Sequence, residues 1–306
     1  MNAHDDTRFF DPRALARVKS LELRTRKIVE GLMSGRHRSP FQGSSVEFAQ
    51  HRQYTQGDDT RHIDWKVFGR SDKLYIKQFQ EETQLQVVLA VDASESMSFG
   101  SVKADDGSTW TKYDYATTLA ATLAYLATAQ VDAVGLSIFD EQLLRYFRPS
   151  AGRSQWRTIV SELQAVPRWN PTGLGKVLEQ LGGKVTHRSL IVLISDFFDD
   201  PAAVERGLKA LRFRKHDVVC LQIADPQELT FPFEDVTLFK GLESSGELLT
   251  EPRGLRKGYL DAMNEHRDAV AKACRHLDTD FHTFDTGEGL EVPLSVFLAG
   301  RAARMK

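Results

Sequence analysis

The regular alternation of apolar strands and amphipathic helices after about residue 84 is the feature that most constrains the fold. Three stretches are almost wholly apolar, as expected of strands buried on both faces of a sheet: QVVLAV, LIVLIS and DVVCLQI. Helical patterns such as DPAAVERGLKALRFR separate them. AVGLSIFD and LLRYFRP are too close for a helical crossover, so these two strands should pair antiparallel. The alternation predicts an α/β fold with a doubly wound, mostly parallel sheet.

Composition limits the class of protein. With 306 residues, of which 41% are hydrophobic, the chain can bury a large core without disulfides. The formal net charge of -2 gives no reason to expect a nucleic-acid partner, and the basic helical stretch 13–38 lacks the aromatic residues that stack on bases. Only Cys220 and Cys274 could form a disulfide, no apolar run reaches about 18 residues, and the N-terminus does not resemble a signal peptide. We therefore expect a cytoplasmic protein with no membrane span.

Oxygen-bearing side chains follow two of the predicted strands. Asp92, Ser94 and Ser96 alternate in DASES directly after QVVLAV, and Asp196 follows LIVLIS. Thr172 lies in NPTGLG, just before a short predicted helix. Because the carboxyl ends of parallel strands meet at one edge of a sheet, we expect these five residues to lie together.

The donor types favour a hard divalent cation. No His or Cys accompanies the two carboxylates and three hydroxyls, so zinc and copper are poor candidates. Mg²⁺ suits such a site, with Mn²⁺ or Ca²⁺ as alternatives. Neutral hydroxyls leave the ion with residual positive charge and an open position, which an Asp or Glu of another protein can fill. The sequence thus predicts a metal-dependent protein-binding module.

The order of DASES, NPTGLG and ISDFF resembles the von Willebrand factor A domain with its metal-ion-dependent adhesion site. The resemblance covers about residues 84–306 and implies a Rossmann-type wrap in which Asp92, Ser94, Ser96, Thr172 and Asp196 bind the metal. Members often have Gly after the final Asp, whereas this chain has Phe197 and then Phe198. We expect these two rings either to narrow the site or to form an apolar rim beside the metal.

The preceding segment resembles the signature of a bacterial family, domain-of-unknown-function family fifty-eight. The matching pieces are Gly43 with SSVEF, then RQY, GDD, RHIDW and KQFQEE. The resemblance implies a von Willebrand A-like domain just downstream and a MoxR-type AAA+ ATPase as companion, with a chaperone-like role in assembling other proteins. We therefore expect two domains, 1–83 with a helix, a charged loop and a strand, and 84–306.

The charged loop of this signature alternates acids and bases around Trp65. The charged residues are Arg52, Asp58, Asp59, Arg61, Asp64 and Arg70. The favoured interpretation is an ion-pair network that packs an extended segment onto the second domain. A partner-docking surface and catalysis with His62 are the alternatives.

Other functions stay open. Ser94, Ser96 and Asp92 could simply cap a helix and hold a turn, although caps do not account for Thr172 and Asp196. The chain lacks phosphate-loop, dinucleotide-binding and nucleophile-elbow motifs, so we do not expect an enzyme. The alternative enzyme is a magnesium-dependent phosphotransferase acting at Asp92, and a third class is a purely structural scaffold.

Overall fold

The computed structural model describes most of the chain and divides it into two compact units. The described residues are 21, 23–29, 48–55, 65–71, 73–79, 85–104, 107–164, 170–242 and 246–304. One unit combines Met1–Phe41 with Leu85–Lys306, and the other is Gln42–Gln84. This division into compact units does not test the predicted domains 1–83 and 84–306, which stay a prediction.

A six-stranded sheet forms the centre of the larger unit, in the order β12-β9-β8-β3-β6-β7. Its strands are β3 (Gln86–Asp92), β6 (Ala133–Phe139), β7 (Leu143–Ser150), β8 (Leu190–Ser195), β9 (Asp217–Ala224) and β12 (Asp280–Asp285). All neighbours pair parallel except β6 and β7, which pair antiparallel as predicted from their short connection. The prediction of a mixed α/β fold with a mostly parallel sheet is confirmed.

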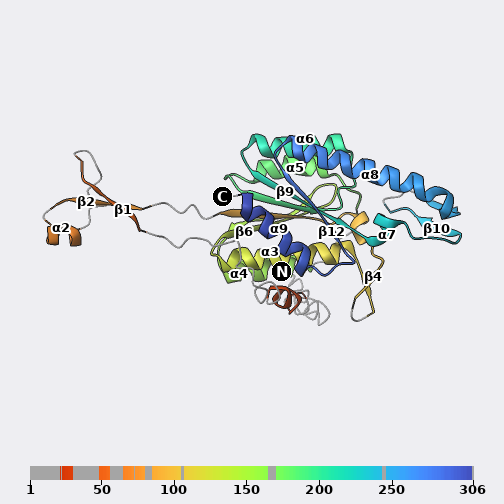
Figure 1. The fold of residues 1–306 in the computed structure, drawn as a ribbon, viewed down its shortest axis with the longest axis horizontal. Helices are drawn as coiled ribbons and strands as arrows, with labels where there is room; N and C mark the ends of the chain where they lie inside the picture. Colours follow the sequence, from red (N-terminus) through yellow and green to blue (C-terminus); the bar gives the residue numbers. More distant parts are fainter. Residues whose placement is uncertain are drawn as a thin grey trace, which may run out of the picture. The chain divides into compact units, whose positions relative to one another are not determined.

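Helices cover both faces of this sheet (Figure 1). One face carries α3 (Lys112–Ala129), α4 (Arg153–Leu163) and α9 (Glu291–Arg304), and the other carries α5 (Leu174–Lys184), α6 (Pro201–Phe213) and α8 (Pro252–His276). Strand β3 contributes to both layers, since Leu89 packs into the core beneath α3 while Val88 packs into the core beneath α5 and α6. This two-sided burial explains why β3 is apolar at every position from Val87 to Val91 rather than at every second one.

The N-terminal helical residues belong to the larger unit. Residues 21 and 23–29 are helical, and Leu21, Ile28 and Val29 are buried in the same core cluster as residues of α3. The rest of the predicted helix 13–38 lies outside the described residues. Within the described part of the chain, no helix is both long and apolar enough to cross a membrane.

Short elements surround the carboxyl end of the sheet. They are the 3-10 helix η3 (Glu95–Ser98), α7 (Pro226–Thr230), the hairpin of β4 (Val102–Lys103) with β5 (Thr109–Trp110), and the hairpin of β10 (Thr237–Lys240) with β11 (Glu247–Thr250). Between α7 and β11, the rings of Phe231, Phe233 and Phe239 contact one another.

The smaller unit is a two-stranded antiparallel sheet of β1 (Phe48–Gln53) and β2 (Tyr75–Phe79), with α2 (Trp65–Ser71) between them in sequence. The segment that we expected to be extended is so in β1 and β2, whereas Trp65 begins the helix α2. Its side chain is 64% exposed and contacts the ring of Phe68 edge-on. The expected ion-pair network falls largely on residues 58–64, which lie outside the described residues.

Candidate functional site

The loop after β3 is held by the carboxylate of Asp92. Its Oδ1 accepts a hydrogen bond from the backbone N–H of Ser94 (2.8 Å), and its Oδ2 accepts one from the hydroxyl of Ser195 (2.6 Å). Because β3 and β8 are adjacent and parallel, the last residues of both strands lie side by side. The loop therefore begins with a buried carboxylate tied to the neighbouring strand.

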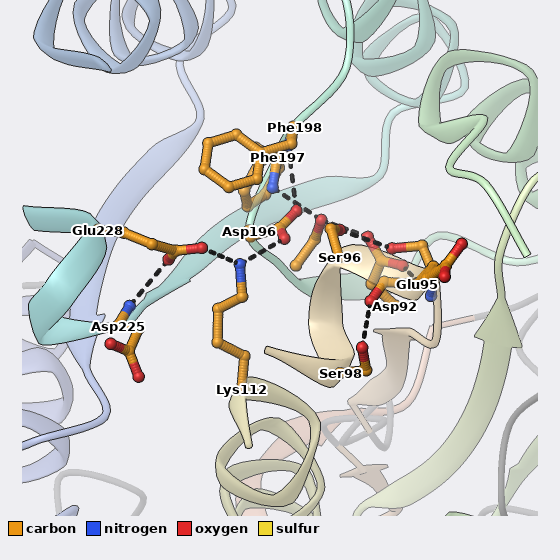
Figure 2. A network of polar contacts seen from close by, with 12 residues as sticks. Asp92, Glu95, Ser96, Ser98, Lys112, Asp196, Phe197, Phe198, Asp225 and Glu228 are labelled. Carbon is orange, nitrogen blue, oxygen red and sulfur yellow. Dashed lines mark hydrogen bonds and ion pairs between the residues drawn. The ribbon is translucent and has the colours of Figure 1, made fainter. Parts of the chain in front are cut away.

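Three of the other predicted ligands, Ser94, Ser96 and Asp196, lie near this carboxylate, and Figure 2 labels Ser96 and Asp196 beside it. The hydroxyls of Ser94 and Ser96 are 3.1 Å apart, and Asp196 follows Ser195 directly. Asp196 is buried, and its Oδ1 accepts a hydrogen bond from the backbone N–H of Phe198 (3.1 Å). The structure thus brings both carboxylates and both serine hydroxyls to one edge of the sheet.

Thr172 lies on the adjoining loop. The backbone N–H of Glu95 donates to the carbonyl of Asn170 (2.8 Å), which fixes this loop beside η3. Asn170 also donates from Nδ2 to Asp140 at the end of β6 (2.6 Å). Thr172 itself is half-buried. Whether these five residues bind a metal stays a prediction.

A lysine that the sequence did not single out lies at the same site. The Nζ of Lys112 is 2.8 Å from Oδ2 of Asp196 and 2.6 Å from Oε1 of Glu228 (Figure 2). The side chain of Lys112 is fully buried. Burial lowers the pKa of this ammonium, but the charges of Asp196 and Glu228 outweigh burial and raise the pKa above its usual value. Lys112 is therefore a buried, charged partner of the predicted ligand Asp196.

Glu228 is positioned by α7. Asp225 caps this helix. In return, the backbone N–H of Asp225 donates a hydrogen bond to Oε2 of Glu228 (3.0 Å). Asp225 also accepts from the backbone N–H of Ser101 (2.8 Å), which precedes β4. Lys112 thus connects the carboxyl end of β8 to α7.

The arrangement lies within a segment that has known relatives. Residues 50–269 match the family described as "Protein of unknown function DUF58". The chain belongs to this family. The resemblance to domain-of-unknown-function family fifty-eight is thereby confirmed, while the von Willebrand A-like wrap and the MoxR association stay predictions.

Similar proteins extend over nearly the whole DUF58 chain. Uncharacterised proteins of Mycobacterium bovis and Mycobacterium tuberculosis are 26% identical over 297 residues, which is 95% of this chain and 90% of theirs. Among solved structures, the conserved hypothetical protein BatB of Bacteroides thetaiotaomicron aligns with 15% identity and a TM-score of 0.49, over 72% of this chain and 99% of its own. An aerotolerance-related membrane protein of Bacteroides fragilis aligns with 16% identity and a TM-score of 0.48, over the same shares.

The donor chemistry of the DUF58 site fits a divalent cation. The ammonium of Lys112 pairs with the carboxylates of Asp196 and Glu228, whereas the buried carboxylate of Asp92 accepts hydrogen bonds from Ser94 and Ser195, so the acids outnumber the one ammonium. Burial and the charge of Asp196 raise the pKa of Asp92 to about 7 despite the hydrogen bonds that it accepts. A bound cation would stabilise the ionised form of Asp92. Among the described residues, no group of three or more His, Cys, Asp or Glu is arranged to hold a metal, but the predicted set takes three of its five donors from hydroxyls.

The expected apolar rim is wrong for Phe197. Its side chain is completely buried and contacts the ring of Phe281, with centroids 5.8 Å apart. Its φ of 61° lies in the left-handed region that glycine adopts without steric cost and that other residues rarely adopt. Phe198 is half-buried, and its ring centroid is 4.8 Å from Nζ of Lys112.

Two signals could have pointed to the residues that sequence reasoning missed. Lys112 is the first residue of α3, where a cation opposes the helix dipole, so its presence there calls for a compensating acid. The DPQE stretch of Asp225 and Glu228 has the spacing of a capping box. Neither signal reveals that Lys112 and Glu228 meet, because 116 positions separate them.

Proposed function

We propose that this DUF58 chain is a metal-dependent protein-binding module of von Willebrand A-like type. Asp92, Ser94, Ser96, Thr172 and Asp196 hold Mg²⁺, and the ion captures an Asp or Glu of a partner protein. The observation that carries the proposal is the gathering of the buried Asp92 and Asp196 with two serine hydroxyls at the ends of adjacent strands. The ion supplies an open, positively charged position for the partner's carboxylate.

The residues of this chain prepare that position. Ser195 and the backbone of Ser94 fix both oxygens of Asp92, so the carboxylate need not reorganise when the cation arrives. The bond from Glu95 to Asn170 keeps the Thr172 loop beside η3.

The partner that we propose is a MoxR-type AAA+ ATPase or its client, in a chaperone-like assembly reaction. The support is the family membership together with the association that the sequence resemblance implies. A cytoplasmic location stays a prediction.

Calorimetric titration of the full chain with Mg²⁺ or Mn²⁺ tests the metal site. We expect about one ion per chain, and we expect Asp92→Asn and Ser96→Ala to weaken binding at least about tenfold, or about 1.4 kcal/mol. Ser98→Ala is the matched control, because Ser98 also lies in η3 but its hydroxyl donates to the carbonyl of Glu95 (2.7 Å). Equal binding by the Ser96 and Ser98 variants would show that the Ser96 hydroxyl is not a ligand of the metal.

A pull-down from the native host, with Mg²⁺ against chelator, tests the captured carboxylate. A protein retained with Mg²⁺, released by chelator and not bound by Asp92→Asn supports the proposal. If the protein is retained equally with chelator and by the Asp92→Asn variant, the proposal is refuted. Magnesium-dependent hydrolysis of a generic phosphate ester that disappears in Asp92→Asn would instead support the phosphotransferase.

A further inference from the structure

The position of Lys112 suggests a second occupant for the site. Its ammonium contacts Asp196, which is one of the proposed metal ligands. We propose that Lys112 competes with the divalent cation for Asp196: it neutralises this carboxylate in the metal-free protein, and it must release the carboxylate when the cation binds. The inference rests on the proposed function and names the residue that sets the affinity of the same site.

Competition follows from the positive charge that already contacts Asp196. Its Oδ2 accepts from the ammonium of Lys112 and its Oδ1 accepts from the backbone N–H of Phe198, so a metal ion on this carboxylate would lie beside a second cation. The side chains of Lys112 and Asp196 are 0% and 1% exposed, so water does little to screen the repulsion between an ammonium and a divalent ion on one carboxylate. The two cations therefore exclude each other from Asp196.

Lys112 keeps a second carboxylate partner when it releases Asp196. Glu228 lies 2.6 Å from its Nζ, and Glu228 is itself held by the backbone of Asp225. The rings of Phe198 and Phe99 also lie near Nζ, with centroids at 4.8 and 6.0 Å. Because Glu228 retains the ammonium, the cation displaces one ion pair and leaves no isolated buried charge. The competition should thus weaken metal binding without abolishing it.

Calorimetry on the full chain with Mn²⁺ alone tests the competition. We expect Lys112→Met to bind Mn²⁺ at least about tenfold more tightly than the wild type, because Asp196 is then free for the ion. Glu228→Gln should bind more weakly, because Lys112 then relies on Asp196. In the double variant, the effect of Glu228→Gln should largely disappear, since there is no ammonium left to retain.

Thermal unfolding is a second measurement, and it can also be made on a variant of low stability. Without metal, Lys112→Met should melt lower than the wild type, because Asp196 and Glu228 lose their buried partner. Saturating Mn²⁺ should raise its melting temperature by more than it raises that of the wild type. Lys112→Gln, which keeps a polar group of similar length, repeats both measurements if Lys112→Met does not fold.

The outcomes separate the inference from the proposed function. Equal or weaker Mn²⁺ binding by Lys112→Met, with binding still lost in Asp92→Asn, overturns the competition and leaves the metal site intact. Absence of Mn²⁺ binding in both the wild type and the Lys112 variants overturns both. Binding that appears only once Lys112 is replaced supports the competition but overturns the proposed function, which requires the wild type to bind the ion.

Discussion

At the scale of single residues, Asp225 has more partners than an ordinary helix cap. It accepts from the backbone of Gln227 (2.9 Å) as the cap of α7, and also from the backbone and hydroxyl of Ser101 and the hydroxyl of Thr286. It is fully buried, so these donors would have no water to replace a lost carboxylate. Asp225 therefore ties three separate segments together near Glu228.

We predict that Asp225→Ala lowers the free energy of unfolding by about 3 kcal/mol or more, because buried donors are left without a partner. Asp200→Ala is the matched control. Asp200 caps α6 but is exposed, so its loss should cost only about 1 kcal/mol. Urea unfolding measures both, and equal costs would mean that Asp225 acts only as a cap.

At the scale of elements, α5 and α6 approach closely because glycines face each other across the contact. A Cβ on Gly207 would lie 2.7 Å from Cβ of Leu178, and one on Gly175 would lie 2.8 Å from the carbonyl of Ala203. We predict that Gly207→Ala destabilises the protein by about 1–3 kcal/mol, since the helices must separate.

Gly183 in α5 is the control for this contact, because a Cβ there would meet nothing within 4 Å. Gly183→Ala should be neutral or stabilise by up to about 1 kcal/mol through helix propensity. Chemical denaturation of the two variants checks the difference. A Gly207→Ala protein as stable as Gly183→Ala would show that the helix contact is not tight.

His216, between α6 and β9, makes this part of the molecule sensitive to pH. The backbone N–H of Ser189 donates to its Nδ1 (3.3 Å), so the buried ring is neutral, and a proton on Nδ1 would break the bond. Burial, with a smaller effect of Arg214, lowers the pKa of His216. Since the unfolded state then binds more protons, stability should fall as the pH drops below about 6.5.

The pH effect is measured as the melting temperature of the wild type and of His216→Gln between pH 8 and pH 5. We expect the wild type to lose more stability than the variant over this range, because the variant has no ring to protonate in the unfolded state. Parallel curves would mean that His216 has the same pKa in both states.

At the scale of the whole molecule, the larger unit depends on residues before the smaller one. Leu21, Ile28 and Val29 are buried with the α3 side of the core, and the guanidinium of Arg24 lies 4.8 Å from the ring centroid of Trp110. We predict that deletion of residues 1–41 lowers the melting temperature by about 10 °C, from the loss of three buried apolar side chains.

The control for this deletion replaces residues 42–84 with a Gly/Ser linker of similar length, which leaves both parts of the larger unit present. We expect this variant to melt within a few degrees of the wild type, since 42–84 forms a separate compact unit. Calorimetric scans decide the matter. A larger loss from the linker variant than from the deletion would show that the smaller unit stabilises the core.

The sequence by itself determined the apolar strands of the central sheet and the grouping of Asp92, Ser94, Ser96 and Asp196 at one edge of it. Apolarity along β3, β8 and β9 reports burial directly, and parallel strands place their carboxyl ends at one edge. Asp92 and Asp196 were predictable for this reason, since each immediately follows the apolar run of a strand.

Only the tertiary structure decided which charge faces Asp196 and where Phe197 points. Lys112 is 84 positions from Asp196, and nothing in the local pattern of α3 indicates which acid its ammonium meets. The inward turn of Phe197 depends on a left-handed backbone and on the ring of Phe281, from a strand much later in the chain. Periodicity reports whether a residue is buried, whereas the partner of a buried charge or ring is set by segments that meet only when the sheet is assembled.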